Sequence, residues 1–269
     1  MDAAGSLRSR PLSMKTLKKL LPFAVVLALW ELLARLGLLN SRLLPAPGAI
    51  FSAAVSLAGS GEIFTDLLFS VKRVFAGFLA AAVLGLGAGA VSGYSRRVSD
   101  AVMPLCEFLR PIPPIAWIPI AILWFGLGDN PAYFIVFVGS FFPIFINSYW
   151  GVRESRLNHL NVARNFGAGA WTILADVLLP GSLPRIMHGL RIGLGLGWTS
   201  VISAELVGAQ SGLGYMIQLN RVMLNTENII VGMAAIGLAG LGMNWLMLLL
   251  ERRLLAWSAE TLRAEERDA

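Results

Sequence analysis

The stretch NVARNFGAGAWTILADVLLPGSLPRI, residues 161–186, lies between two long apolar runs of the chain. It mixes polar side chains with glycines and prolines, whereas the runs on either side carry very little charge. A plain connection between two membrane helices needs far fewer residues than this. The fold therefore depends on what this half-polar stretch forms and on which side of a membrane it lies.

Apolar residues in and around this stretch recur at helical spacing. The pattern predicts a short amphipathic helix over about 156–166, followed by Gly167 in the left-handed conformation that ends many helices. A second helix is predicted over about 169–179, with Pro180 stopping it and Pro184 stiffening the approach to the next apolar run. Its expected apolar side consists of Trp171, Leu174, Val177 and Leu178. The result is either a rigid elbow or an interfacial helix that lies on lipid headgroups.

The composition is that of an integral membrane protein. Of the 269 residues, 56% are hydrophobic and 14% are charged, whereas a soluble domain carries roughly 25% charged residues. The single cysteine, Cys106, excludes an internal disulfide and a zinc site built on cysteines, and we expect it to be a small buried hydrophobic residue. The formal net charge of +6 reflects membrane topology, and no nucleic acid partner is expected.

Six apolar segments are long enough to cross a bilayer, which needs about 20 mostly apolar residues per helix. No small-residue cleavage site follows the first segment, so we expect a retained helix and not a signal peptide. Two glycine series with a four-residue spacing, Gly85-Gly89-Gly93 and Gly189-Gly193-Gly197, predict closely packed helices. The predicted spans are 17–38, 74–95, 101–127, 130–152, 186–207 and 228–250. The expected fold class is therefore all-α, a polytopic membrane protein with six transmembrane helices.

The lysines and arginines predict the orientation. They concentrate before the first span, after the second, in the connection 153–185 and after the sixth. These regions share one side if the chain crosses six times, and the opposite loops hold few basic residues. We therefore predict a transmembrane domain over 17–257 with cytoplasmic tails at 1–16 and 258–269, so that both termini are cytoplasmic.

The chain shows no motif for catalysis, for a metal or for nucleotide binding. No Gly-Lys-Ser or Gly-Lys-Thr phosphate loop exists, and no lysine follows a glycine. The two histidines, His159 and His188, do not form a His-Glu-x-x-His motif, and we expect ordinary surface or interfacial histidines. We assign no catalytic residue and no metal ligand, and expect no cofactor to bind this chain. An enzyme is not indicated.

Polar residues inside the spans mark a candidate substrate pathway, because a charge at the bilayer centre costs about 2.5–3.5 kcal/mol on insertion scales. Arg110 precedes a proline cluster, and it either pairs with Glu107 on the same helix face or faces the pathway and meets an anion. Glu205 would repel an anion, so we expect a gating or packing role. The other candidates are Trp117, Asn147, Trp198 and Ser203, although tryptophans at such places are more typical of packing.

The elbow resembles the cytoplasmic signature loop of ABC-importer permeases, Glu-Ala-Ala-x3-Gly-x9-Ile-x-Leu-Pro. Asn161 replaces the glutamate and Val162 the first alanine, so the acid of the motif is absent. The spacing from the glycine to Leu-Pro is intact. The matching residues are Ala163, Gly167, Leu179 and Pro180, with Val177 in place of the isoleucine.

The resemblance covers about residues 20–257 and is to the nitrate, sulfonate and taurine branch of these permeases, which also includes bicarbonate transporters. The proline-rich third span and the run Ala-Glu-x-x-Gly-Ala-x-Ser-Gly-Leu-Gly-Tyr are fairly specific to that branch. The similar stretches are LLPAPGAI (43–50), SVKRVFAGF (70–78), RPIPPIAWIPIAILWFGLGDN (110–130), FFPIFINSYWGV (141–152) and GLGWTSVISAELVGAQSGLGYMI (195–217).

This resemblance implies the permease fold of a type I ABC importer in a bacterial inner membrane, with a cytoplasmic coupling helix between the fourth and fifth spans. It implies a separate ABC ATPase that binds ATP and magnesium, a second permease copy in a homodimer, and a periplasmic binding protein. Alternating access would import a small anionic nutrient such as nitrate, taurine or another sulfonate, or bicarbonate. The coupling residues would be Asn161, Val162, Ala163, Arg164, Phe166, Gly167, Ala168, Leu179 and Pro180.

A stand-alone secondary transporter or channel is the main alternative from another class. Such proteins often show repeated halves with broken helices at matching positions. This chain has no convincing internal repeat, and its intramembrane prolines cluster in one span. A membrane enzyme is opposed by the missing catalytic residues.

Overall fold

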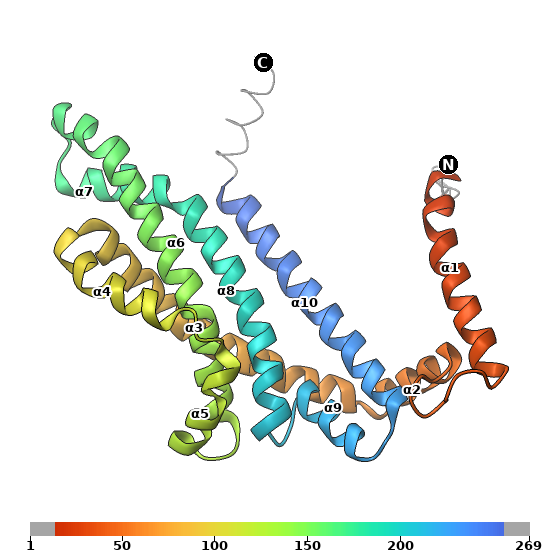
Figure 1. The fold of residues 1–269 in the computed structure, drawn as a ribbon. Coiled ribbons are helices and arrows are strands. Elements are labelled where there is room, and N and C mark those ends of the chain that lie inside the picture. Colours follow the sequence, from red (N-terminus) through yellow and green to blue (C-terminus); the bar gives the residue numbers. More distant parts are fainter. Residues whose placement is uncertain (1–13, 256–269) are drawn as a thin grey trace, which may run out of the picture.

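The structure is a computed structural model that describes residues 14–255, apart from the side chains of 14–20, 23–24, 157–162 and 170. Within this part the chain is helical and contains no strand, as the all-α prediction required (Figure 1). The predicted tails lie largely outside the described residues, since the first helix begins at Met14 and the last ends at Leu254.

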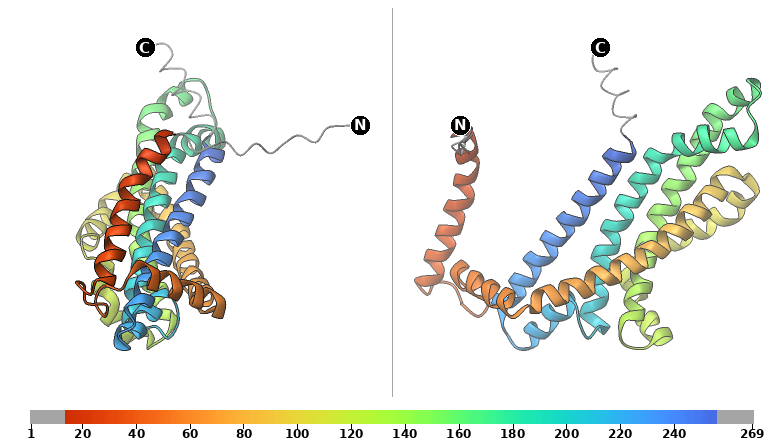
Figure 2. Two further views of the ribbon diagram at one scale, coloured as in Figure 1. Left: turned by 90° about the vertical axis from the view of Figure 1, so that its right-hand side faces the viewer. Right: turned by 180° about the vertical axis from the view of Figure 1, so that it is seen from behind.

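Four helices of the described part are long and apolar enough to cross a membrane. They are α3 (Glu62–Tyr94), α6 (Asp129–Asn165), α8 (Leu179–Gly208) and α10 (Thr226–Leu254). The helix α6 packs along α3 on one side and along α8 on the other, and buried residues such as Ile135, Val136 and Val201 fill the contacts (Figures 1 and 2). The bundle therefore has α6 at its centre.

The predicted third span is broken. It consists of α4 (Arg96–Leu109), the 3-10 turn η1 (Pro114–Trp117) and α5 (Ile118–Phe125), and the two halves are bent by 88°. Prolines at 111, 113 and 114 cause the break, because proline donates no backbone hydrogen bond and disfavours helix in the residue before it. Counted as one span, this pair raises the number of candidate spans in the described part to five.

The first helix, α1 (Met14–Arg35), stands apart from the bundle and packs on α2 (Pro47–Ser60) (Figure 2). Glu31 links the two helices, since its carboxylate accepts hydrogen bonds from the Arg35 side chain at 2.6 Å and from the Gly48 amide at 2.9 Å. The charged residues of α1 keep it outside the set of helices that qualify as spans. The count of six spans thus stays a prediction.

The glycine series confirm the prediction of close helix packing. A Cβ atom on Gly89 of α3 would lie 2.5 Å from the carbonyl oxygen of Phe145 on α6. On the other side of α6, a Cβ atom on Gly189 of α8 would lie 2.5 Å from the Cβ of Asn147. The backbones of α3 and α8 thus approach α6 so closely that only hydrogen fits at these positions.

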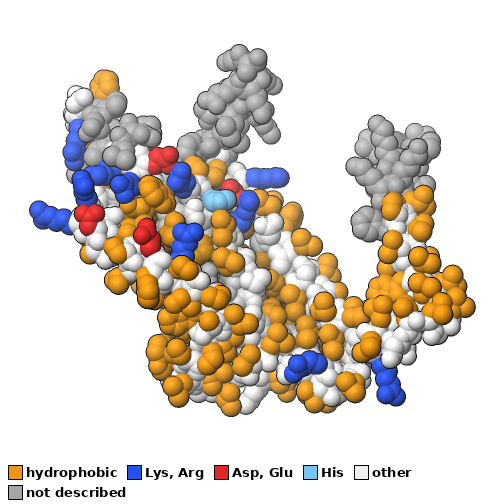
Figure 3. Space-filling model, in the orientation of Figure 1, with side chains coloured by type: hydrophobic (Ala, Val, Ile, Leu, Met, Phe, Trp, Pro, Cys, Tyr) orange, Lys and Arg blue, Asp and Glu red, His pale blue; other side chains and the backbone are white. Residues whose placement is uncertain are grey.

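The connections between the helices lie at two opposite ends of the bundle. The turn between α3 and α4, the turn after α6 and the end of α10 lie at one end, whereas α5, α9 (Leu213–Val222) and the α1–α2 connection lie at the other (Figure 1). Lys and Arg side chains gather over the first end, and hydrophobic side chains dominate the rest of the visible face (Figure 3). We call the first end the basic end.

Candidate functional site

An elbow at the basic end follows α6. Gly167 adopts φ +77°, its amide donates to the carbonyl of Arg164 at 2.9 Å, and the Ala168 amide donates to the carbonyl of Ala163 at 3.0 Å. This pair of bonds with a left-handed glycine is the Schellman motif that ends helices. The predicted left-handed Gly167 is therefore confirmed.

Two details of the predicted elbow are wrong. The helix expected over 156–166 is the last part of α6 and not a separate element. Pro180 does not stop the second helix, because the chain runs from α7 (Ala170–Thr172) through the π-helix η2 (Ile173–Leu178) directly into α8. Pro180 is the second residue of α8 and directly follows the π-helix, in which the Leu179 amide donates to the carbonyl of Leu174.

The predicted coupling residues divide into a buried and an exposed set. Ala163 and Ala168 pack against buried Ile173 and Leu178, which hold the corner together. Of the predicted apolar side, Leu178 is buried and Val177 is half-buried, whereas Trp171 and Leu174 are exposed. Arg164, Phe166, Gly167 and Leu179 are exposed and Pro180 is half-buried, while the side chains of Asn161 and Val162 lie outside the described residues.

The tip of the elbow exposes aromatic side chains. Phe166 is 88% exposed and Trp171 is 78% exposed. Clustered exposed apolar side chains next to charged residues are typical of a protein or membrane contact. The corner beneath them is held by the Schellman bonds and the Ile173–Leu178 contact, so the tip is presented on a defined backbone.

A cavity of about 320 Å³ lies between η1, α6 and α8. Arg110 and Asn147, two of the predicted pathway residues, both line it. Pro143 also lines it and cannot donate a hydrogen bond to the carbonyl of Gly139, and the Asn147 amide donates to the carbonyl of Pro143 at 2.8 Å. The cavity therefore combines one cation with amide and backbone dipoles inside an otherwise apolar wall.

The alternative that Arg110 pairs with Glu107 is wrong. No ion pair joins them in the structure, and Glu107 lines a different cavity beside Met103 and Trp150. Arg110 is therefore a cation without a carboxylate partner among the described residues.

The other predicted pathway residues lie elsewhere. Trp117 stacks edge-on against Phe134 with ring centroids 6.3 Å apart. Trp198 is buried, and its indole donates to the carbonyl of Ile236 on α10 at 3.2 Å. Ser203 donates to the carbonyl of Thr199 within its own helix at 3.2 Å. These three side chains join or stabilise helices, and none of them lines the cavity that holds Arg110.

Glu205 belongs to a buried charge cluster at the end opposite the elbow. Arg73 of α3 is 1% exposed and donates to the Glu205 carboxylate at 2.7 Å and to Asp129 at 2.5 Å and 2.9 Å. It also donates to the carbonyl and the hydroxyl of Ser211 at 2.7 Å and 2.6 Å. All five guanidinium N–H groups are thus engaged. The cluster ties together α3, the start of α6, the end of α8 and the loop that follows it.

The loop after α8 is shaped around the Glu205 carboxylate. The Glu205 Oε2 atom, to which Arg73 does not donate, accepts hydrogen bonds from the Ser70 hydroxyl at 2.8 Å and from the Gly214 amide at 2.9 Å. Gly212 has φ +103°, and a Cβ atom there would lie 2.4 Å from the Glu205 carboxylate. Asp66 accepts from the Gly212 amide at 2.8 Å. The glycines of the Ser-Gly-Leu-Gly run are therefore needed for the carboxylate to lie against the backbone.

Arg73 was not among the residues predicted from the sequence. The predicted second span began at Val74 because the preceding turns carry charges, and that criterion placed Arg73 outside the membrane domain's helices. Glu205 could have pointed to such a residue, because it lies inside a predicted span and a buried carboxylate requires a hydrogen-bond donor or a cation as its partner.

Comparisons with known proteins agree with this architecture. The family described as binding-protein-dependent transport system inner membrane component matches residues 62–256. The taurine transport system permease of Escherichia coli is 32% identical, over 93% of this chain and 93% of its own length. A putative aliphatic sulfonates transport permease of Bacillus subtilis is 36% identical, over 90% and 87% of the two chains. The bicarbonate transport system permease of Synechococcus elongatus is 32% identical, over 92% and 95%.

Among solved structures, a chain of the MetNI methionine ABC transporter is similar in fold, with a TM-score of 0.50, 20% identity, and coverage of 67% of this chain and 93% of that one. The long helices of the bundle lie within the matched family region, as do the elbow, the cavity that holds Arg110 and the Arg73 cluster. The chain therefore belongs to the binding-protein-dependent transport system inner membrane components, the permease subunits of ABC importers.

Proposed function

We propose that this chain moves a small anionic nutrient across the inner membrane by alternating access, driven through the elbow by a separate ATPase. The anion is a sulfonate such as taurine, or a small oxyanion of the bicarbonate or nitrate type. A periplasmic binding protein delivers it, a second copy of the chain completes the pathway, and the ATPase binds the ATP and magnesium. The basic end faces the cytoplasm, and both chain termini are on the cytoplasmic side of the membrane.

The elbow carries the coupling part of the proposal. Its exposed Phe166 and Trp171 stand on a corner closed by the Gly167 bonds, and α6 and α8 continue from the two sides of that corner. A push on the tip is therefore transmitted to both helices that line the Arg110 cavity. The same linkage works in reverse, so that occupancy of the pathway alters the affinity for the ATPase.

The Arg110 cavity supports the choice of an anion. It lies between α6 and α8, and its volume of about 320 Å³ is at the small end of ligand pockets. Arg110 has no carboxylate partner in the described part of the chain. An oxyanion can therefore pair with Arg110 without first displacing a carboxylate of the protein. The relatives named for taurine, sulfonate and bicarbonate transport point to the same class of substrate.

Replacing Gly167 tests the coupling. At φ +77° a valine strains the corner by about 1–2 kcal/mol. We expect Gly167→Val to insert normally but to lower uptake and permease-dependent ATP hydrolysis together in proteoliposomes. Gly169→Ala is the matched control, because Gly169 has no neighbour within 4 Å of an added Cβ and no positive φ. Unchanged uptake by Gly167→Val would count against the elbow as the coupling element.

Co-purification separates the proposal from a stand-alone transporter. The affinity-tagged chain, expressed with the genes around its own, should bring down an ATPase, and Phe166→Ala with Trp171→Ala should weaken that association. Uptake in liposomes that hold this chain without any ATPase would overturn the proposal in favour of a secondary transporter or channel.

A further inference from the structure

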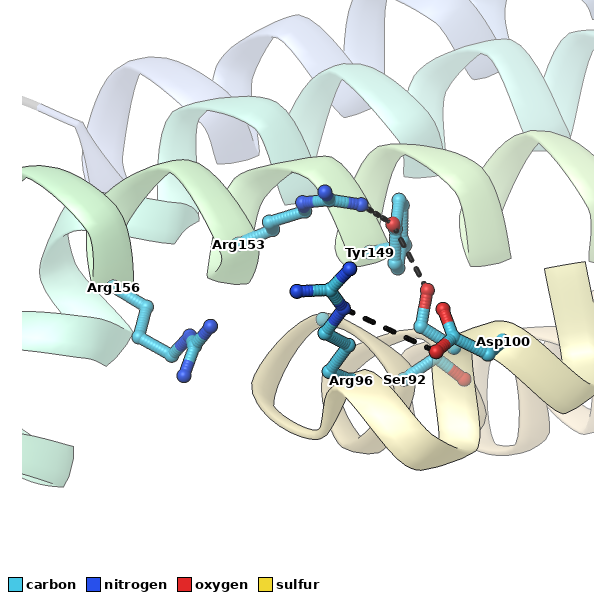
Figure 4. Close-up of a pocket in the computed structure, with 8 residues that line it drawn as sticks. Ser92, Arg96, Asp100, Tyr149, Arg153 and Arg156 are labelled. Atoms are coloured by element: carbon cyan, nitrogen blue, oxygen red, sulfur yellow. Dashed lines mark hydrogen bonds and ion pairs between the residues drawn. The ribbon is translucent and has the colours of Figure 1, made fainter.

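A second cavity, of about 300 Å³, lies at the basic end, where α3 meets α4 and both face α6. Figure 4 shows Arg96 and Asp100 rising from the first turns of α4, and Tyr149, Arg153 and Arg156 projecting from α6. This cavity shares no lining residue with the one that holds Arg110. We call it the arginine cavity.

The arginine cavity carries more positive charge than its acid compensates. Asp100 is its one lining acid and pairs with Arg96 at 4.0 Å, with both side chains exposed. Arg153 donates to the Tyr149 hydroxyl and lies over the rings of Tyr149 and Trp150, at 5.5 Å and 5.4 Å from their centroids. Neither Arg153 nor Arg156 forms an ion pair with any described residue. Two guanidinium groups are thus held beside the cavity without a carboxylate.

Two buried polar atoms at the arginine cavity lack partners. Ser92 lines the cavity and is 2% exposed, yet its hydroxyl makes no hydrogen bond in the structure. The Nε of Arg156 is also buried and unbonded. Buried polar atoms in native proteins are satisfied by protein, by ordered water or by an ion. The Arg156 Nε–H can only donate and the Ser92 hydroxyl can donate or accept, so one acceptor group beside them would satisfy both atoms.

Membrane topology alone does not account for this arrangement. A basic residue that marks the cytoplasmic side needs only to be exposed, as Arg96, Arg97 and Arg153 are, whereas Arg156 is half-buried. Topology requires neither arginines from two helices around one cavity nor a buried serine donor beside them. In addition, the first turn of α4 lines the cavity, and its N-cap Ser95 makes no side-chain capping bond. A helix start of this kind favours anions.

We propose that the arginine cavity binds a tetrahedral oxyanion group, of the sulfate, sulfonate or phosphate type. Arg153 and Arg156 pair with the anion, which also accepts from Ser92. The group is either a free oxyanion on the basic side of the membrane or the phosphate of an anionic lipid headgroup. The site shares no lining residue with the Arg110 cavity, and the inference does not depend on the proposed function.

The test is equilibrium binding of radiolabelled sulfate to the purified full-length chain in nanodiscs of phosphatidylcholine. The binding variant is Arg153→Gln with Arg156→Gln, and the matched control is the exposed neighbour Arg97→Gln. All proteins also carry Arg110→Gln, which removes the cation of the intramembrane cavity. We expect the double variant to bind about 10- to 100-fold more weakly than the control, the loss typical of charge-assisted hydrogen bonds.

A second arm identifies the source of the oxyanion. Nanodiscs with increasing phosphatidylglycerol should inhibit sulfate binding competitively if a lipid headgroup occupies the site, and should leave it unchanged if a free oxyanion does. Equal sulfate binding by the double variant and the Arg97→Gln control, with equal melting temperatures, overturns the proposal. If the double variant melts earlier, Arg153→Lys with Arg156→Lys keeps the charges and should restore part of the binding; failure to do so while folded also overturns it.

Discussion

At the scale of single residues, Arg73 shows how a charge is kept inside a membrane helix. Its five donors are all used, on two carboxylates and on both oxygens of Ser211. Glu205, whose side chain is 0% exposed, depends on this cation. A buried pair of this kind adds little when intact, but removing one partner leaves an uncompensated charge and is strongly destabilising.

We therefore expect Arg73→Gln to lower the stability of the folded chain by about 3–5 kcal/mol. Glu205→Gln should cost less, because Arg73 keeps Asp129 and Ser211 as partners. Thermal unfolding of the detergent-purified proteins measures the difference, with the exposed Arg221→Gln as the control. If Arg73→Gln and Arg221→Gln have the same melting temperature, the Arg73 cluster does not stabilise the end of the bundle opposite the elbow.

At the scale of elements, the sequence predicted the apolar middle of the long helices but not their ends. The helix α3 begins at Glu62 and not at Val74, and two of the charged residues before Val74, Asp66 and Arg73, are paired with the loop after α8 and with Glu205. The helix α6 continues to Asn165, where its last turns carry the elbow beyond the apolar segment. Hydrophobicity marks lipid exposure, whereas helix ends depend on caps such as Gly167 and on tertiary pairs that no local pattern shows.

The contact between α3 and α6 yields a matched pair of variants. Gly89→Ala places a methyl group 2.5 Å from the carbonyl oxygen of Phe145, a backbone atom that cannot turn aside. Gly87→Ala, half a turn earlier in the same helix, meets no atom within 4 Å. Overpacking at Gly89 should cost about 1–3 kcal/mol, whereas Gly87→Ala should be neutral or slightly stabilising.

Melting temperatures of the two purified alanine variants measure this difference. They also test whether the close approach of α3 to α6 limits stability. Equal melting temperatures would show that α3 moves away from α6 at no cost.

At the scale of the whole molecule, the candidate sites were predictable only in part. Arg110 and Asn147 were each chosen as polar residues within spans, and the break at Pro111–Pro114 brings them to one cavity. The arginine cavity could not be predicted from the sequence, because it joins Arg96 to residues more than fifty positions away on α6. Local spacing predicts which residues share a helix face, but it does not predict which helices meet.

The orientation of the whole chain in the membrane is the last prediction. The exposed lysines and arginines gather at the basic end (Figure 3). At the other end, the α1–α2 connection exposes Arg42 and α9 exposes Arg221. Because basic loops stay in the cytoplasm, the elbow should be cytoplasmic and the end of α2 should face outward. Gly169 and Gly59 mark these two places, and both are exposed with no atom within 4 Å of an added Cβ.

Single cysteines at these two glycines, in a Cys106→Ala background, report the side directly. A membrane-impermeant maleimide added to spheroplasts should label Gly59→Cys and spare Gly169→Cys, and inverted membrane vesicles should give the opposite pattern. Cys106 is buried, with 6% of its surface exposed, and its removal prevents slow background labelling. The removal does not alter the exposed positions 59 and 169. Labelling of Gly169→Cys from the outside would place the elbow where no cytoplasmic ATPase can reach it, and the proposed coupling would fail with the topology.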